Sequence, residues 1–209
     1  MIFVNRQPEP EGFDREVRQR GYAWLLKNCI ASDSAPSDPG SLRPFWQHYN
    51  KELWDAYRGV CAYLAVYFDY GIGATTDHFI AKSRHAGKAY EWDNYRLACP
   101  GVNQRKNKYD DILDPFEIPA DTFFLALDTG AIYVNPLLYE QNKKVADLAE
   151  KTIKRLHLDS PYNREMRVAY FNEYIENRKE SLGHFPEKFL MKHNPFVFHE
   201  MRRQGLIPQ

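Results

Sequence analysis

Apolar residues recur three and four positions apart along much of the chain, which is the spacing of one face of an α-helix. In the first third of the chain, this pattern predicts a helix over residues 13–30 and a second over residues 44–57, with Pro44 suited to a first turn. The apolar run over residues 60–70 predicts a third helix, although a strand over residues 62–68 fits the same side chains.

The second half of the chain combines two predicted strands with three predicted helices. Residues 123–127 and 131–134 are short apolar runs on either side of Asp128-Thr129-Gly130, a pattern typical of a β-hairpin. Helices are predicted over residues 142–156, over residues 161 to about 182 with Gly183 as the stop, and over residues 196–203. The fold class indicated is α+β and mainly helical.

The composition limits the size and the location of the protein. The chain has 209 residues, of which 44% are hydrophobic, enough for one sizeable core, so we expect a single globular unit over residues 1–209. Three irregularly spaced cysteines, Cys29, Cys61 and Cys99, favour a reducing compartment. Because no signal peptide opens the chain and no apolar run is long enough to span a bilayer, we expect a cytoplasmic protein without membrane segments.

Charge is balanced over the whole chain but not along it. Lys+Arg and Asp+Glu both number 28, yet residues 77–108 carry seven basic side chains against three acidic ones, and residues 109–128 carry six acids and no base. A basic segment in a neutral chain is typical of a local phosphate-binding face, although an ordinary solvated loop would have the same composition. The candidate phosphate contacts are Lys82, Arg84, Arg105 and Lys106.

The same segment contains the groups that phosphodiester hydrolysis requires, namely a base, ligands for a divalent cation and cationic side chains. Asp77 and His78 are adjacent at the end of a short β-prone run, so their side chains point to opposite sides of a strand. A second extended run follows at residues 95–98, and then a polar helix at residues 102–108. Asp77 and Asn103 are oxygen ligands suited to Mg²⁺ or Mn²⁺, which leaves His78 as the candidate base.

These residues resemble the HNH, or His-metal finger, endonucleases. The resemblance lies in positions that follow one another in the order of the family motif: Asp77-His78, Lys82-Ser83, Trp92-Asp93-Asn94, Cys99, Asn103 and Lys106. It implies a ββα-metal finger over residues 60–111, in which Asp77 and Asn103 bind the cation, His78 is the general base, and Asn94 braces the loop that orients His78. Residues 1–59 and 112–209 would form a helical scaffold, with the hairpin near residues 123–134.

Many members of the family also bind a structural zinc through two CxxC pairs. Here the corresponding positions read Cys61-Ala62-Tyr63-Leu64 and Cys99-Pro100-Gly101-Val102, so each pair retains one cysteine. Because a tetrahedral zinc site needs four ligands, we expect no structural zinc.

Beyond the motif, Asp114-Pro115, the hairpin and the phrase TIKRLHLDSPYNREMR at residues 152–167 resemble the HNH partner proteins of Septu-type and retron-linked anti-phage systems. That resemblance implies DNA as the substrate and an ATPase-type protein as the partner. The alternative is a catalytically silent module that uses the finger to bind nucleic acid or a protein. The choice between DNA and RNA rests on resemblance alone, and the sequence leaves nicking versus double-strand cleavage and homo-oligomer formation open.

Overall fold

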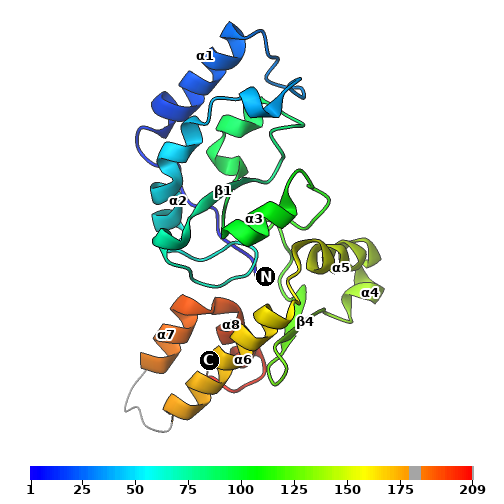
Figure 1. Cartoon of the computed structure of the whole chain (residues 1–209). Coiled ribbons are helices and arrows are strands. Elements are labelled where there is room, and N and C mark those ends of the chain that lie inside the picture. The colour runs from blue at the N-terminus through cyan, green and yellow to red at the C-terminus, as the bar shows by residue number, and fades with distance from the viewer. Residues whose placement is uncertain (179–184, 209) are drawn as a thin grey trace. The chain divides into compact units, whose positions relative to one another are not determined.

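The structure is a computed structural model that describes residues 1–178 and 185–208 (Figure 1). Its helices are combined with two separate two-stranded antiparallel sheets, so the prediction of a mainly helical α+β fold is confirmed. In the described part of the chain, no helix is both long and apolar enough to cross a membrane.

The chain forms two compact units, each built from separated segments. The ββα unit, as we call it, comprises Asn5–Gly59 and Asp69–Asp110, and the scaffold unit comprises Met1–Val4, Val60–Phe68 and Asp111–Gln209. We had predicted a single globular unit over residues 1–209. Whether the two units pack into one body is not tested by this division, so that expectation stays a prediction.

The ββα unit begins with two helical regions that match the first two predicted helices. A π-helical stretch, Asp14–Gln19, continues into α1, Arg20–Lys27, and a 3₁₀ helix, Phe45–Tyr49, continues into α2, Asn50–Ala56. Gly21 lets α1 pack directly against a ring in the loop that follows β1, because a Cβ at this position would lie 2.2 Å from Tyr90.

Two strands and a helix follow in the predicted order. Strand β1, Thr75–His78, pairs antiparallel with β2, Tyr95–Ala98, with Asp77 opposite Arg96. Helix α3, Pro100–Lys106, begins with a proline at its first turn and ends before Asn107, whose φ of 48° leaves the helical range. The ββα element itself therefore spans residues 75–106.

The helix predicted over residues 60–70 is wrong. This segment is a compact loop of the scaffold unit, in which Val60 and Tyr67 form an isolated antiparallel bridge and Ala65 has a φ of 51°. Its apolar run is buried almost throughout, so it lacks the polar face by which an amphipathic helix is recognised. The scaffold unit therefore takes up residues 60–68, which we had assigned to the finger.

The scaffold unit contains the predicted hairpin and the predicted C-terminal helices. Strand β3, Phe123–Ala126, pairs with β4, Ala131–Val134. The helices are α4 Leu138–Gln141, α5 Lys143–Leu156, α6 Pro161–Arg178, α7 Phe185–His193 and α8 Pro195–Arg203. Helices α4 and α7 were not predicted, and the predicted end of α6 near Leu182 and its stop at Gly183 lie outside the described residues.

A buried arginine ties the hairpin turn to the connection between α5 and α6. The guanidinium of Arg167 donates to the carbonyl oxygens of Gly130 at 3.0 Å and Leu158 at 2.7 Å, and burial lowers the pKa of Arg167 to about 10. Gly130 has a φ of 68°, and a Cβ there would lie 2.2 Å from the Arg164 carbonyl oxygen, so the turn requires glycine.

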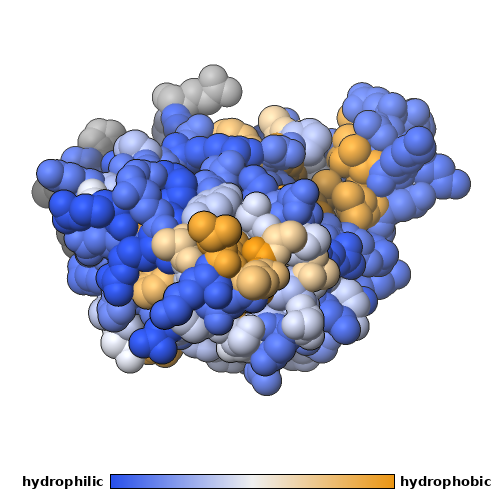
Figure 2. Space-filling model, turned by 90° about the horizontal axis from the view of Figure 1, so that it is seen from above, coloured by the Kyte–Doolittle hydropathy of each residue, from blue (hydrophilic) through white to orange (hydrophobic). Residues whose placement is uncertain are grey.

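Some large apolar side chains of the described residues remain exposed in both units. The face shown in Figure 2 is largely hydrophilic, with small apolar patches. Leu26 at the end of α1 is the most exposed of the large apolar side chains described, at 82%.

Candidate active site

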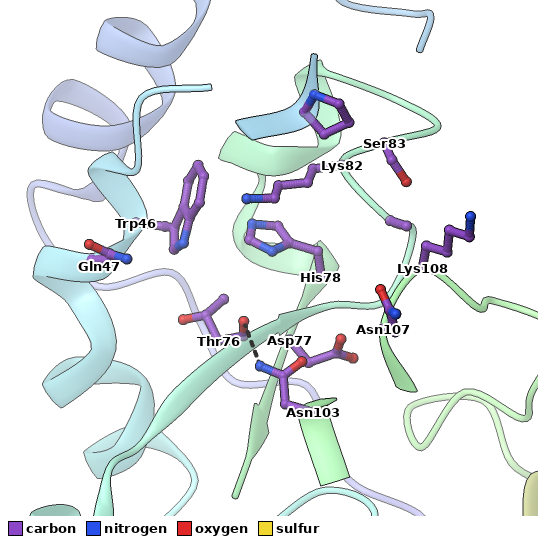
Figure 3. Close-up of a pocket in the computed structure, with 12 residues that line it drawn as sticks. Trp46, Gln47, Thr76, Asp77, His78, Lys82, Ser83, Asn103, Asn107 and Lys108 are labelled. Carbon is purple, nitrogen blue, oxygen red and sulfur yellow. Dashed lines mark hydrogen bonds between the residues drawn. The ribbon is translucent and has the colours of Figure 1, made fainter. Parts of the chain in front are cut away.

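A pocket of about 400 Å³ lies in the ββα unit where β1, the start of the following loop and α3 come together. Asp77, His78 and Asn103 line it, together with Lys82 from the loop (Figure 3). The structure thus brings both candidate metal ligands and the candidate base into one cavity. Asp77 is the one acidic side chain among the described residues that line this pocket.

His78 is held by a backbone carbonyl in the loop between the two strands. Its Nε2 lies 3.1 Å from the oxygen of Ala89, and the hydroxyl of Tyr95 donates to the same oxygen at 2.7 Å. Because a carbonyl oxygen only accepts hydrogen bonds, Nε2 carries the hydrogen in the neutral ring. Nδ1 therefore keeps its lone pair and is the nitrogen that can accept a proton.

The surroundings keep the imidazole neutral. Burial lowers the pKa of His78 to about 3, and the nearby cations Lys82 and Lys106 act in the same direction, whereas the hydrogen bond to Ala89 opposes them. Trp46 packs edge-on against the ring with a centroid distance of 4.8 Å. The ring is therefore uncharged at neutral pH.

Asn94 closes the loop that contains Ala89. Its Oδ1 accepts from the backbone amide of Ile80 at 2.8 Å, and its Nδ2 donates to the carbonyl oxygens of Ile80 at 3.0 Å and Lys88 at 2.8 Å. Asn94 is buried and does not line the pocket, so it positions the loop without touching a reacting group. This contact pattern fits the bracing role that the family resemblance implies.

Asn103 presents its amide oxygen toward Asp77. Its Nδ2 donates to the hydroxyl of Thr75 at 3.0 Å and to the carbonyl of Thr76 at 3.4 Å, which fixes the orientation of the amide. Figure 3 shows the Asn103 oxygen on the side of the Asp77 carboxylate. One carboxylate and one amide oxygen fit a magnesium-type cation that keeps most of its waters.

A closed metal cage is a different arrangement from this one. Within the described residues, no three His, Cys, Asp or Glu side chains gather as a metal-binding group. Magnesium-type ions in substrate-processing sites need no such group, because water and substrate oxygens complete their shell.

Lys106 occupies a different place from the one predicted. Its side chain is fully buried, and its ammonium donates to the carbonyl oxygen of His78 and, at 2.7 Å, to that of Phe79. The ammonium also lies 3.3 Å from Oδ1 of Asp77. The expectation that Lys106 contacts a phosphate is not supported by this placement. Lys106 follows Asn103 by three residues, so both side chains were expected on one face of the helix. The burial of Lys106 could not be predicted from the sequence, because lysine is usually exposed.

The other predicted phosphate contacts differ in how available they are. Lys82 lines the pocket, half-buried, with its ammonium 5.0 Å from the centre of the Trp46 ring, and burial lowers its pKa. Arg84 forms an ion pair with Asp110 at 2.7 Å. Arg105 is exposed on α3, and Lys108, to which we had assigned no contact, is exposed and lines the pocket.

No protein-family model matches the chain, and no curated protein matches its sequence significantly.

Proposed function

We propose that the chain is a metal-dependent endonuclease that hydrolyses phosphodiester bonds in DNA. The supporting observation is the state of His78, whose Nε2 is engaged by the Ala89 carbonyl while Nδ1 keeps its lone pair in a pocket that is also lined by Asp77 and Asn103. A purely structural role for His78 would leave unexplained why Asp77 and Asn103 line the same pocket.

The mechanism assigns one task to each group. Asp77 and Asn103 would hold Mg²⁺ or Mn²⁺, which neutralises charge that develops on the phosphate and the leaving oxygen. Nδ1 of His78 accepts the proton of the water that attacks phosphorus. Lys82 contributes a half-buried positive charge to the pocket, and the exposed Arg105 and Lys108 contact neighbouring phosphates.

Plasmid cleavage with and without Mg²⁺ or Mn²⁺ tests this proposal. Cleavage should need the metal, and His78→Ala should reduce the rate by roughly 10²- to 10⁴-fold, the usual effect of losing a general base. His48→Ala is the matched control, because His48 is an exposed histidine of the same unit that does not line the pocket. Equal rates for His78→Ala and the parent would falsify the assignment.

We further propose that the nuclease acts in anti-phage defence under the control of an ATPase-type partner. Two of the four predicted phosphate contacts are occupied, since Lys106 is buried and Arg84 is paired with Asp110. Lys82, Arg105 and Lys108 remain as candidate phosphate contacts. A small number of phosphate contacts gives only weak, salt-sensitive binding to DNA, with a Kd on the order of 10⁻⁴ to 10⁻⁶ M. The C-terminal helices expose Tyr162 and Met191, which are candidate partner contacts.

Co-purification with the proteins encoded by the neighbouring genes tests this dependence. The isolated chain should cleave slowly at physiological salt, and the complex should cleave faster. Rapid digestion by the isolated chain would contradict the proposed control while leaving the nuclease assignment intact.

A further inference from the structure

Lys106 carries a positive charge inside the ββα unit. Its side chain has no exposed surface, and three oxygen atoms surround its nitrogen: the carbonyl oxygens of His78 and Phe79, and Oδ1 of Asp77 at 3.3 Å. All three are acceptors, so three hydrogens are needed on the nitrogen to satisfy them. Only the charged ammonium form has three hydrogens, and this form therefore lies beside Asp77.

The charge of Asp77 is thus balanced before any metal arrives. Arg96, which is also buried and lies opposite Asp77 in the strand register, is a second positive group close enough to act electrostatically on Lys106. Lys82 contributes a third at the pocket wall. The acidic group that acts on Lys106 from further along the chain, Asp110, is itself paired with Arg84. A divalent cation therefore approaches a site that offers little net attraction.

We propose that Lys106 keeps the metal site weak in the free protein, and that the phosphodiester of the substrate supplies the negative charge that completes it. This inference rests on the proposed nuclease function and specifies the order in which its site assembles. Metal and DNA then bind cooperatively, and by thermodynamic linkage each raises the affinity for the other by the same factor.

A purely structural role for Lys106 makes a different prediction. A lysine that only ties β1 to α3 would lower stability when replaced but would leave metal affinity unchanged or reduced. A lysine that balances Asp77 opposes the metal, so its neutral replacement should bind metal more tightly. The two roles are therefore separated by a binding measurement that needs no catalysis.

The first experiment measures Mn²⁺ binding, by the loss of the free-ion electron paramagnetic resonance signal, with and without a short DNA duplex. The protein is His78→Ala, which keeps Asp77, Asn103 and Lys106 and leaves the DNA intact. Asp77→Asn in the same mixture gives the background from ions bound to DNA. The Kd for Mn²⁺ should fall on the order of tenfold or more when DNA is added. Tight binding without DNA, or no change with DNA, overturns the proposal.

The second experiment adds Lys106→Met, a neutral side chain of similar length, to the His78→Ala protein and measures Mn²⁺ alone. The Kd should fall on the order of tenfold, because the competing charge is gone. An unchanged or weaker Kd in a variant that retains its circular dichroism spectrum overturns the role of Lys106. If this variant does not fold, the first experiment still decides whether DNA completes the site.

The outcomes separate this inference from the proposed function. Metal-dependent cleavage together with tight Mn²⁺ binding in the absence of DNA keeps the nuclease and rejects the inference. Cooperative binding of Mn²⁺ and DNA without any cleavage by the parent chain keeps the inference and rejects the nuclease.

Discussion

The chain contains two small sheets of the same size that differ in what they bury. Each consists of two antiparallel strands of four residues. In β3 and β4, buried and less buried positions alternate, and the fully buried side chains are apolar: Phe123, Leu125, Ile132 and Val134. In β1 and β2, burial does not alternate, and Asp77, His78 and Arg96 are all buried.

The difference separates a stabilising sheet from one that carries the candidate site. Burying apolar side chains favours folding, whereas burying charged or polar groups costs free energy unless each has a partner. The buried polar groups of β1 and β2 find partners outside the two strands. His78 contacts the Ala89 carbonyl and Arg96 donates to the Asp93 carbonyl, both in the connection of residues 79–94, whereas Asp77 pairs with Lys106 of α3. The β3–β4 pair is joined by a short turn that includes Gly130, and Arg167 holds this turn.

The largest effect on stability is expected from Leu125→Ala in the stabilising sheet. Leu125 is fully buried, so the loss of its side chain leaves a cavity and should lower the free energy of unfolding by about 2–5 kcal/mol. Urea unfolding measures this loss. DNA cleavage by the protein that remains folded should match the parent, and a defect there would mean that the scaffold unit takes part in the chemistry.

The turn of the same sheet offers the next test. Gly130→Ala forces a side chain into a left-handed conformation and against the Arg164 carbonyl, which should cost on the order of 1–3 kcal/mol. Thermal unfolding gives the value, and Gly205→Ala is the matched control, with a φ of 75° but open space around its Cβ. A smaller loss at Gly130 than at Gly205 would show that the close approach to Arg164 is unimportant.

In the connection between β1 and β2, Asn94→Ala should affect activity more than Leu125→Ala does. The loop loses three hydrogen bonds, and the Ala89 carbonyl that holds His78 is no longer fixed, so the cleavage rate should fall by roughly 10- to 100-fold. The readout is the rate of plasmid nicking at saturating metal. Asn94→Asp, which keeps one acceptor, should recover part of the rate if positioning is the cause.

The smallest effect is expected from Tyr95→Phe. It removes one of the two hydrogen bonds to the Ala89 oxygen but leaves that of His78, so the loss should be about 0.5–1.5 kcal/mol of stability with little change in rate. Tyr133→Phe on β4 is the control, because Tyr133 is exposed and its replacement should be close to neutral. A rate as low as that of His78→Ala would assign Tyr95 to the chemistry.

Local sequence signals predicted those parts of the fold that depend on neighbouring residues. The hairpin followed from Asp128-Thr129-Gly130, and the order of β1, β2 and α3 followed from a β-prone run and a polar helix. The helix predicted for this part of the chain was wrong because residues 60–68 are buried almost throughout. Such a run shows no alternation of hydrophobic and polar positions from which a helix or a strand could be recognised.

The residues of the candidate site could be predicted from the sequence more easily than the hydrogen bonds that position them. Asp77, His78 and Asn103 were selected from the sequence and do line one pocket. The group that sets the tautomer of His78 is the backbone carbonyl of Ala89. Because every residue has a backbone carbonyl, the sequence does not indicate which one His78 contacts. The burial of Lys106 depends on tertiary packing, because lysine is usually exposed.

The interleaving of the two units has a consequence for synthesis. All segments of the ββα unit, including both strands and α3, precede residue 111, whereas the scaffold unit needs Val60–Phe68 from early in the chain together with segments up to its C-terminal helices. Because domains generally fold as units while the chain emerges, the candidate site can be complete before the scaffold has its last helices. A nascent chain whose synthesis pauses well beyond residue 110 would then already contain the folded candidate pocket.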